Sequence, residues 1–138
     1  VTCIRFLDKK TKREFYFWNT HFDHRVQPAR EKAASLVNKK VAELKKELPI
    51  ILVGDFNASA KMNKTYDILV DSGGFEDTIV TAKESINADW NTINGFRETR
   101  KGSRRIDWVL SKGGVKTLKA EIVLFDNSKQ YPSDHPTV

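Results

Sequence analysis

The chain lacks a second cysteine and a long apolar run, and each of these two absences excludes a class of protein. With Cys3 as its single cysteine, it forms no internal disulfide and no cysteine-based zinc site. No apolar run approaches the roughly 18 residues that a membrane-spanning helix needs, so we expect no transmembrane segment. The opening VTCIRFL is typical of the middle of a protein rather than of a signal peptide, so no localisation is predicted.

The composition indicates one globular domain with a basic balance. The 138 residues include 39% hydrophobic and 30% charged residues, which is typical of a folded chain. Lysine and arginine outnumber aspartate and glutamate by 24 to 18, giving a net charge of +6 and a pI near 9.5. This excess favours polyanionic partners such as nucleic acid or an anionic membrane surface. Much of it falls on Lys39, Lys40, Lys45 and Lys46, however, which fit the solvent face of a helix better than a binding patch.

Periodicity predicts alternating strands and helices. Residues 1–7 and 14–20 predict a β-hairpin whose second strand, apolar in both alternating sets, is covered on both faces. Pro28 is well placed to open a helix that ends before Pro49, with an apolar stripe every three or four residues. That stripe consists of Ala29, Ala33, Val37, Val41, Leu44 and Leu48. A buried strand over 50–53 and a second helix over 61–72, ended by Gly73 and Gly74, follow.

The second half of the chain is less regular. Residues 76–104 lose periodicity, and a loop of this length in a compact domain is usually functional. Strands are predicted again over 105–110 and 115–125, and the last residues lead into another strand. The order of elements therefore predicts an α/β fold with helices packed on a sheet, in which functional residues collect on loops at one end of the strands.

Two candidate site residues follow the strand over 50–53. Asp55 and Asn57 leave the strand end on the same side, because side chains alternate along an extended chain, and Phe56 between them points into the core. Their oxygen atoms suit magnesium or a reacting water. The alternative is an ordinary solvent-exposed turn, since glycine, aspartate and asparagine are common turn formers.

Three further clusters fall near predicted strand ends. The first, NTHFDH at 19–24, contains His21 and is similar to a zinc-hydrolase pattern, but too few histidines are present for a zinc site. The second is Asp107 within RIDWVL, which needs a charged partner if its strand is buried and otherwise shares an exposed face with Arg105. The third is PSDHP, where flanking prolines favour an irregular segment that turns both Asp134 and His135 inward.

Taken in order, NTHFDH, VGDFNA, GSRRIDWVL and YPSDHPTV resemble the endonuclease/exonuclease/phosphatase superfamily over nearly the whole chain. The resemblance implies a four-layer α/β sandwich of two similar halves. This chain matches the second half only, so residues 1–138 are expected to form the C-terminal portion of one such domain. The expected fold is half of the sandwich, a mixed and largely antiparallel sheet with helices on one face. The first half would supply an asparagine and a metal-binding glutamate.

The resemblance also implies a role for each matching residue. Asp55 would orient the attacking water or the metal, and Asn57 would hold the phosphate or the nucleophile. His135 would act as general base or bond the phosphoryl group, oriented by Asp107. His21 would contact a nonbridging oxygen or assist the leaving group. Magnesium, with manganese as second choice, would be held by Asp55, Asn57 and Asp134.

Other residues have two interpretations. Arg105, Trp90 and Phe96 are candidate substrate contacts, and loop packing is an equally good explanation for the two aromatic residues. His24, Asp23 and Arg25 would support the site or serve only the fold.

The leading hypothesis is therefore divalent-metal-dependent hydrolysis of phosphoesters, nucleic acid included, by the protein that carries this chain. The alternative is a noncatalytic module that binds polyanions or other proteins. Self-association through an exposed sheet face is a further expectation, because large apolar surfaces seldom stay free.

Overall fold

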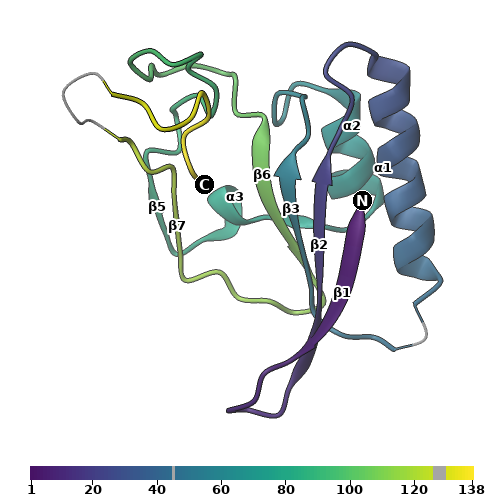
Figure 1. The fold of residues 1–138 in the computed structure, drawn as a ribbon. Helices are drawn as coiled ribbons and strands as arrows, with labels where there is room; N and C mark the ends of the chain where they lie inside the picture. The colour runs from purple at the N-terminus through teal and green to yellow at the C-terminus, as the bar shows by residue number, and fades with distance from the viewer. Residues whose placement is uncertain (45, 126–129) are drawn as a thin grey trace.

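The computed structural model describes residues 1–44, 46–125 and 130–138 and shows a five-stranded sheet with the longest described helix on one face (Figure 1). The sheet has the order β1-β2-β3-β6-β4, formed by Thr2–Leu7, Glu14–His21, Ile50–Asp55, Asp107–Lys112 and Glu76–Asp77. Strands β2 and β3 are parallel, and the other neighbouring pairs are antiparallel. The predicted mixed, largely antiparallel sheet is confirmed. None of the described helices is long and apolar enough to cross a membrane.

Helix α1, Gln27–Ala42, covers one face of the sheet and is shorter than predicted. Proline lies in its first turn as expected, but the helix ends six residues before Leu48. The chain turns there toward Pro49 and β3, and Leu44 and Leu48 still pack against the core from outside the helix. Lys45, one of the lysines predicted on the solvent face, lies outside the described residues.

The second predicted helix is also shorter. It consists of α2, Lys64–Asp67, and the π-helical turn η1, Ile68–Ser72, followed by Gly73. Asn63 caps α2, because its side chain accepts a hydrogen bond of 2.9 Å from the backbone N–H of Thr65. The start near residue 64 is therefore set by a capping side chain rather than by the apolar pattern.

The segment predicted as one long loop, 76–104, contains three short elements. They are β4, α3 (Thr78–Thr81) and β5 (Glu84–Ile86). Strand β5 pairs in parallel with β7, Lys119–Glu121, in a separate two-stranded sheet. In the described residues, the strand predicted over 115–125 is thus limited to β7 and an isolated bridge between Val123 and Thr137. The same bridge is the part of the expected last strand that these residues form. The apolar run is longer than the available pairing edge.

The core lies between the sheet and its helices. Phe56, fully buried as predicted, stacks on Trp108 with ring centroids 4.2 Å apart, and Tyr66 of α2 meets Trp108 edge-on at 5.2 Å. These aromatic contacts join Phe56, between Asp55 and Asn57, to Trp108, the second residue of β6. The core therefore fixes both strand ends where the candidate residues lie.

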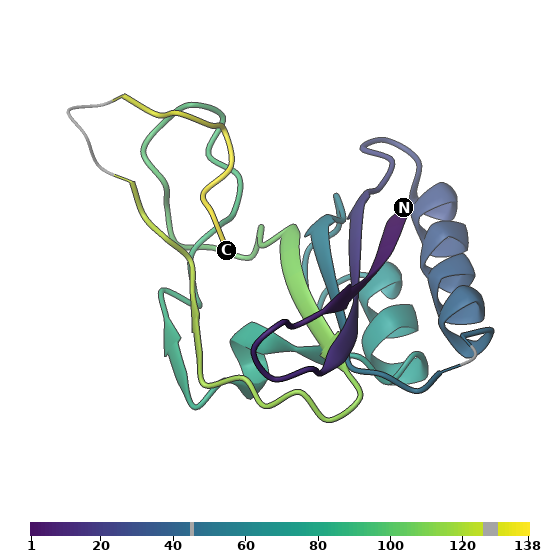
Figure 2. The same ribbon diagram turned by 60° about the horizontal axis from the view of Figure 1, so that its bottom comes forward.

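The opposite face of the sheet carries apolar side chains that remain partly exposed. Both helices α1 and α2 lie on one side of the sheet (Figure 2). Tyr16 and Trp18 point to that side and are buried, whereas Phe15 and Phe17 point away and are half-buried against Phe6, which is 43% exposed. The prediction that the second strand is covered on both faces is wrong for the described residues. Self-association through this face stays a prediction.

Gly54 allows β2 and β3 to approach each other next to Asp55. Its φ is +146°, and a Cβ at this position would lie 1.9 Å from the carbonyl oxygen of Thr20. We expect Gly54→Ala to lower the free energy of unfolding by at least about 2 kcal/mol, because the methyl group must push two paired strands apart. Urea unfolding measures the change.

Gly114→Ala is the matched control for this substitution. Gly114 also has a positive φ, +77°, but a Cβ there would meet no atom within 4 Å. Its replacement should therefore cost only the backbone strain, about 1 kcal/mol. Equal losses in the two variants would show that strand contact at Gly54 is unimportant.

Candidate active site at one end of the sheet

Three candidate residues form one row across neighbouring strands. His21 ends β2, Asp55 ends β3 and Asp107 begins β6. The sheet register pairs His21 with Asp55 and Asp55 with Asp107, so their side chains share one face. Neighbouring strands lie about 4.8 Å apart, which brings the three side chains within reach of one another. Backbone pairing therefore assembles residues that are 86 positions apart in the sequence.

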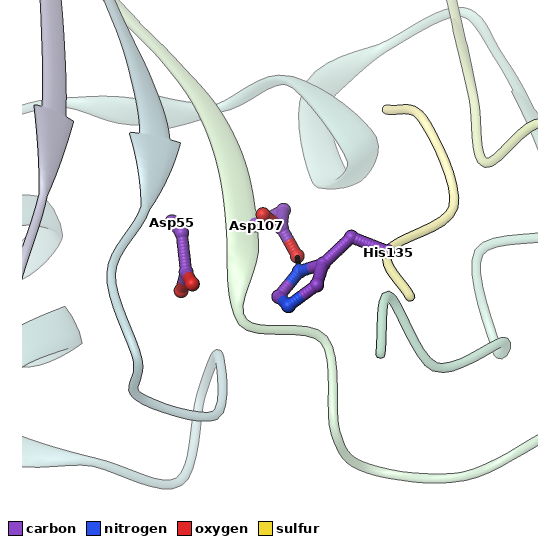
Figure 3. Close-up of side chains that lie close together, drawn as sticks. All are labelled: Asp55, Asp107 and His135. Carbon is purple, nitrogen blue, oxygen red and sulfur yellow. Dashed lines mark hydrogen bonds and ion pairs between the residues drawn. The ribbon is translucent and has the colours of Figure 1, made fainter. Parts of the chain in front are cut away.

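His135 reaches this row from the C-terminal segment. Its Nδ1 lies 2.8 Å from Oδ2 of Asp107, and Figure 3 shows the ring between that segment and the end of the sheet. An ionised carboxylate only accepts hydrogen bonds, so Nδ1 is the donor in this contact, and in the neutral imidazole Nε2 then has a lone pair. The predicted contact between Asp107 and His135 is present. Asp107 also has the hydrogen-bonding partner that its place in an apolar strand required.

Asp55 is held by its neighbour Asn57. Its Oδ1 accepts a 2.7 Å bond from the backbone N–H of Asn57, and the Asn57 side-chain amide donates to Asp55 Oδ2 at 3.2 Å. The same amide donates to the carbonyl oxygen of Phe22 at 3.1 Å, which ties it to the end of β2. His21 Nε2 is 3.5 Å from Asp55 Oδ2, with a side chain that is 73% exposed. Asp55 and Asn57 thus act as one polar unit.

Partial burial and clustered carboxylates change the ionisation of the pair formed by Asp107 and His135. Burial raises the pKa of the Asp107 carboxyl, and hydrogen bonds with His135 and Thr92 offset this only in part. Burial by itself would lower the pKa of His135. The hydrogen bond to Asp107 and the negative charges of Asp107, Asp55 and Asp134 outweigh it, so the pKa of His135 is raised. The imidazole is therefore more basic than a free one.

Thr92 is a residue of this site that the sequence pattern did not reveal. Its side chain is fully buried, and its Oγ1 accepts bonds from the backbone N–H groups of Ile106 and Asp107 at 2.8 and 2.9 Å. The segment predicted as a loop thus fixes the first residue of β6. A buried threonine within an aperiodic, polar stretch gives no signal in a single sequence.

Arg105 does not belong to the substrate side of the site. Its guanidinium is 8% exposed and forms an ion pair with Asp77, whose side chain is 1% exposed. Asp77 also accepts a 2.9 Å bond from the hydroxyl of Tyr66. Arg105 and Asp107 therefore share no exposed face, and Arg105 is withdrawn as a substrate contact. A buried cation needs a partner, and Asp77 supplies it from β4.

The other predicted residues lie outside the row. Asp134 precedes His135, and its carbonyl oxygen accepts bonds from the backbone N–H groups of Asn94 and Gly95 at 2.8 and 3.3 Å. Trp90 and Phe96 line a cavity rather than the row itself.

Three further predicted residues, His24, Asp23 and Arg25, lie exposed in the turn after β2. Asp23 accepts bonds from the backbone N–H groups of Arg25 and Val26, which supports a structural role for this residue.

The donor atoms at the row fit a hard divalent cation. Ligand atoms of Asp55, Asp107 and His135 all lie within 4.8 Å of one another. Two carboxylates with the Asn57 amide beside them suit Mg²⁺ or Mn²⁺, which prefer oxygen ligands. Asp134, predicted as a metal ligand, is not part of this group of three in the described part of the chain.

Comparison with known proteins shows what the chain as a whole is similar to. Residues 1–135 match the profile described as the endonuclease/exonuclease/phosphatase family. The mannosyl-6-phosphatase Bt3783 of Bacteroides thetaiotaomicron has a similar structure, with a TM-score of 0.87 and 30% identity over 97% of this chain. A Bacteroides vulgatus protein described as an endonuclease/exonuclease/phosphatase has a TM-score of 0.83 and 28% identity over 97% of this chain. No match was found among curated proteins.

A more distant similarity concerns the fold alone. The catalytic domain of human Nocturnin has a TM-score of 0.66 and 17% identity over 96% of this chain. The chain spans about half the length of these solved structures, 53% of the mannosyl-6-phosphatase, 51% of the B. vulgatus protein and 48% of Nocturnin. The matched part contains every residue of the row and the C-terminal histidine.

Proposed function

We propose, from the premise that the chain belongs to the endonuclease/exonuclease/phosphatase family, that the site around Asp107 and His135 hydrolyses phosphate esters. The observation that carries the proposal is the 2.8 Å contact between these two side chains, placed in register with Asp55 at the end of the sheet. A carboxylate that orients an imidazole beside a second carboxylate is suited to removing a proton from water.

The chain's own residues account for the activation of the attacking water, which bonds to phosphorus as the ester P–O bond breaks, and the departing oxygen takes a proton from solvent. Asp107 accepts from Nδ1 of His135 and keeps the ring in the tautomer whose Nε2 takes a proton from the attacking water. The raised pKa of His135 makes the imidazole a stronger base than free histidine. Asp55, fixed by Asn57, orients that water from the other side of the gap. His21, exposed at the rim, is placed to donate a hydrogen bond to a phosphate oxygen.

Magnesium is proposed as the cofactor, held by Asp55 with the help of Asn57 and Asp107. When bound, such a cation neutralises the negative charge that develops on the phosphoryl oxygens. The fit of carboxylate and amide oxygens to a hard cation supports this part of the proposal. The previously expected contribution of Asp134 is then its charge beside His135 rather than direct coordination.

Among phosphate esters, a sugar phosphate monoester is the substrate class we propose. The similarity to a mannosyl-6-phosphatase, at 30% identity over almost all of this chain, supports a monoester rather than a nucleic acid. The noncatalytic alternative, binding of polyanions through the basic surface, rests on the net charge of +6 and on the metal-binding glutamate that the first half of the domain would supply.

Removal of divalent cations tests the proposed chemistry. In the protein that carries these 138 residues, EDTA should lower phosphate release from mannose 6-phosphate by at least about 100-fold, because a metal ion contributes several kcal/mol to such a transition state. Added Mg²⁺ or Mn²⁺ should restore the rate. Salt-dependent binding of nucleic acid without hydrolysis under any metal would favour the noncatalytic alternative.

A further inference from the structure

A cavity lined by four aromatic side chains lies beside the C-terminal segment. Its volume is about 660 Å³, within the range of small-molecule sites, about 300–1,000 Å³. It is lined by Trp90, Phe96, Arg97, Glu98, Thr99, Leu124, Phe125 and Tyr131. None of these residues takes part in the proposed chemistry, so the cavity needs a separate explanation.

The aromatic cavity adjoins His135. A smaller cavity of about 100 Å³ is lined by His135 itself and shares three lining residues, Thr99, Phe125 and Tyr131, with the larger one. The two cavities are therefore neighbours with a common wall. A group attached to a phosphate beside His135 would extend toward the aromatic side chains.

Phe96 is held in a position that packing does not explain. It is 61% exposed, and its φ of +60° lies in the left-handed region, which is unfavourable for a bulky residue. The Asn94 side chain fixes this conformation, because its Oδ1 accepts a 2.8 Å bond from the Phe96 N–H. The backbone N–H groups of Asn94 and Gly95 donate to Asp134, next to His135. Strained residues of this kind cluster at ligand sites.

Trp90 forms a second wall of the cavity. Its backbone pairs with that of Lys101 in an isolated bridge, and Lys101 Nζ lies 6.0 Å from the centre of the indole ring. The same ammonium group is 2.7 Å from Asp89 Oδ2. The bridge therefore fixes the backbone of Trp90, and the exposed ammonium group adds a weak attraction to the indole face.

We propose that this aromatic cavity binds the sugar ring of the substrate, with Phe96 as the main stacking surface. The inference rests on the proposed phosphatase function and adds the part of the site that selects the substrate. The C–H face of a pyranose packs on aromatic rings, and its hydroxyl groups bond to a few polar side chains at the rim. Arg97 and Glu98 offer donors and acceptors there. Their charges cancel, so the lining suits a neutral ring better than the further phosphates of a nucleic acid.

The test compares substrates that differ only in the organic group. The protein that carries these residues is assayed with Mg²⁺ on mannose 6-phosphate, glucose 6-phosphate and ethyl phosphate, with a single-stranded DNA oligonucleotide as competitor. At least one hexose phosphate should have a kcat/KM that is about tenfold or more above that of ethyl phosphate. Phe96→Ala should reduce this ratio by about tenfold, which corresponds to about 1.4 kcal/mol of lost binding, mainly through KM.

Two variants control for indirect effects. Phe96→Tyr keeps the aromatic ring and should keep the preference. Leu118→Ala removes a side chain that is 63% exposed and lies outside the cavity lining. It should therefore leave kcat/KM unchanged for both the hexose phosphates and ethyl phosphate.

Equal kcat/KM for hexose and ethyl phosphates, or an unchanged ratio in Phe96→Ala, would overturn the sugar site while leaving phosphate ester hydrolysis intact. Weaker inhibition by the oligonucleotide in Phe96→Ala, without a change for hexose phosphates, would assign the cavity to nucleobases and also overturn it. Absence of hydrolysis with every ester would instead refute the proposed function.

Discussion

His135→Gln is expected to lower kcat by about 10²–10⁴-fold, the usual contribution of a general base. Glutamine keeps much of the size and can still bond to Asp107, but it cannot accept a proton. Phosphate release under saturating Mg²⁺ measures the loss. His24→Gln is the matched control, because His24 is an exposed histidine in the turn after β2. Equal rates for His135→Gln and the unsubstituted protein would end the role of His135 as base.

The dependence of the rate on pH gives a second test of the role of His135, with a predicted direction. The pKa of His135 is raised, so the imidazole remains protonated to a higher pH than free histidine, and a reaction that needs its neutral form loses rate below that pKa. Asp107→Asn removes the carboxylate that contributes most to the increase. The acid limb of the rate profile should therefore move to lower pH in this variant, while the rate at the plateau falls because the ring is less well oriented. An acid limb that stays in place would contradict the pairing.

Asp55→Asn is the second large effect, with an expected loss of about 10²–10³-fold in kcat/KM, as for other fixed electrostatic groups of active sites. The substitution removes the charge at the centre of the row while keeping the shape. It should also raise the Mg²⁺ concentration needed for half-maximal activity, because a carboxylate ligand is lost. Titration of activity with Mg²⁺ measures both changes.

Asp67→Asn provides the comparison for Asp55→Asn. Asp67 is an exposed aspartate on α2, and its replacement removes the same charge at a residue that is not part of the row. Activity and Mg²⁺ requirement should be unchanged in this variant. Loss of activity in Asp55→Asn that no concentration of Mg²⁺ alters would indicate that Asp55 orients the water and does not hold the cation.

Sequence alone led to most of the row because its members carry chemistry at strand ends. A carboxylate in an apolar strand, such as Asp107, has a cost that a partner must offset, and His135 proved to be that partner. Alternation along β3 predicted the buried Phe56 between two polar neighbours, and its exposed fraction of 0% confirms this. These inferences depend on local patterns that a single sequence contains.

The features that the sequence did not reveal depend on contacts between distant segments. Arg105 looked like a free cation beside Asp107, and only the fold brings Asp77 to it from 28 residues away. Thr92 is one threonine among several polar residues, and its two bonds to the start of β6 exist only after the chain has folded back. The short elements β4, α3 and β5 have too few residues for a periodic signal.

The strand register that aligns His21, Asp55 and Asp107 fixes the reactive groups independently of the residues proposed to select the substrate. Hydrogen bonds between strands set the spacing of the reactive groups, whereas the aromatic walls belong to segments outside the main sheet. Exchanging residues 96–99, which leaves the bonds of Asn94 and Gly95 to Asp134 in place, should thus change which esters the proposed enzyme hydrolyses without altering its reactive groups. For protein engineering, this end of the sheet is a constant scaffold on which the substrate-selecting segments can be exchanged.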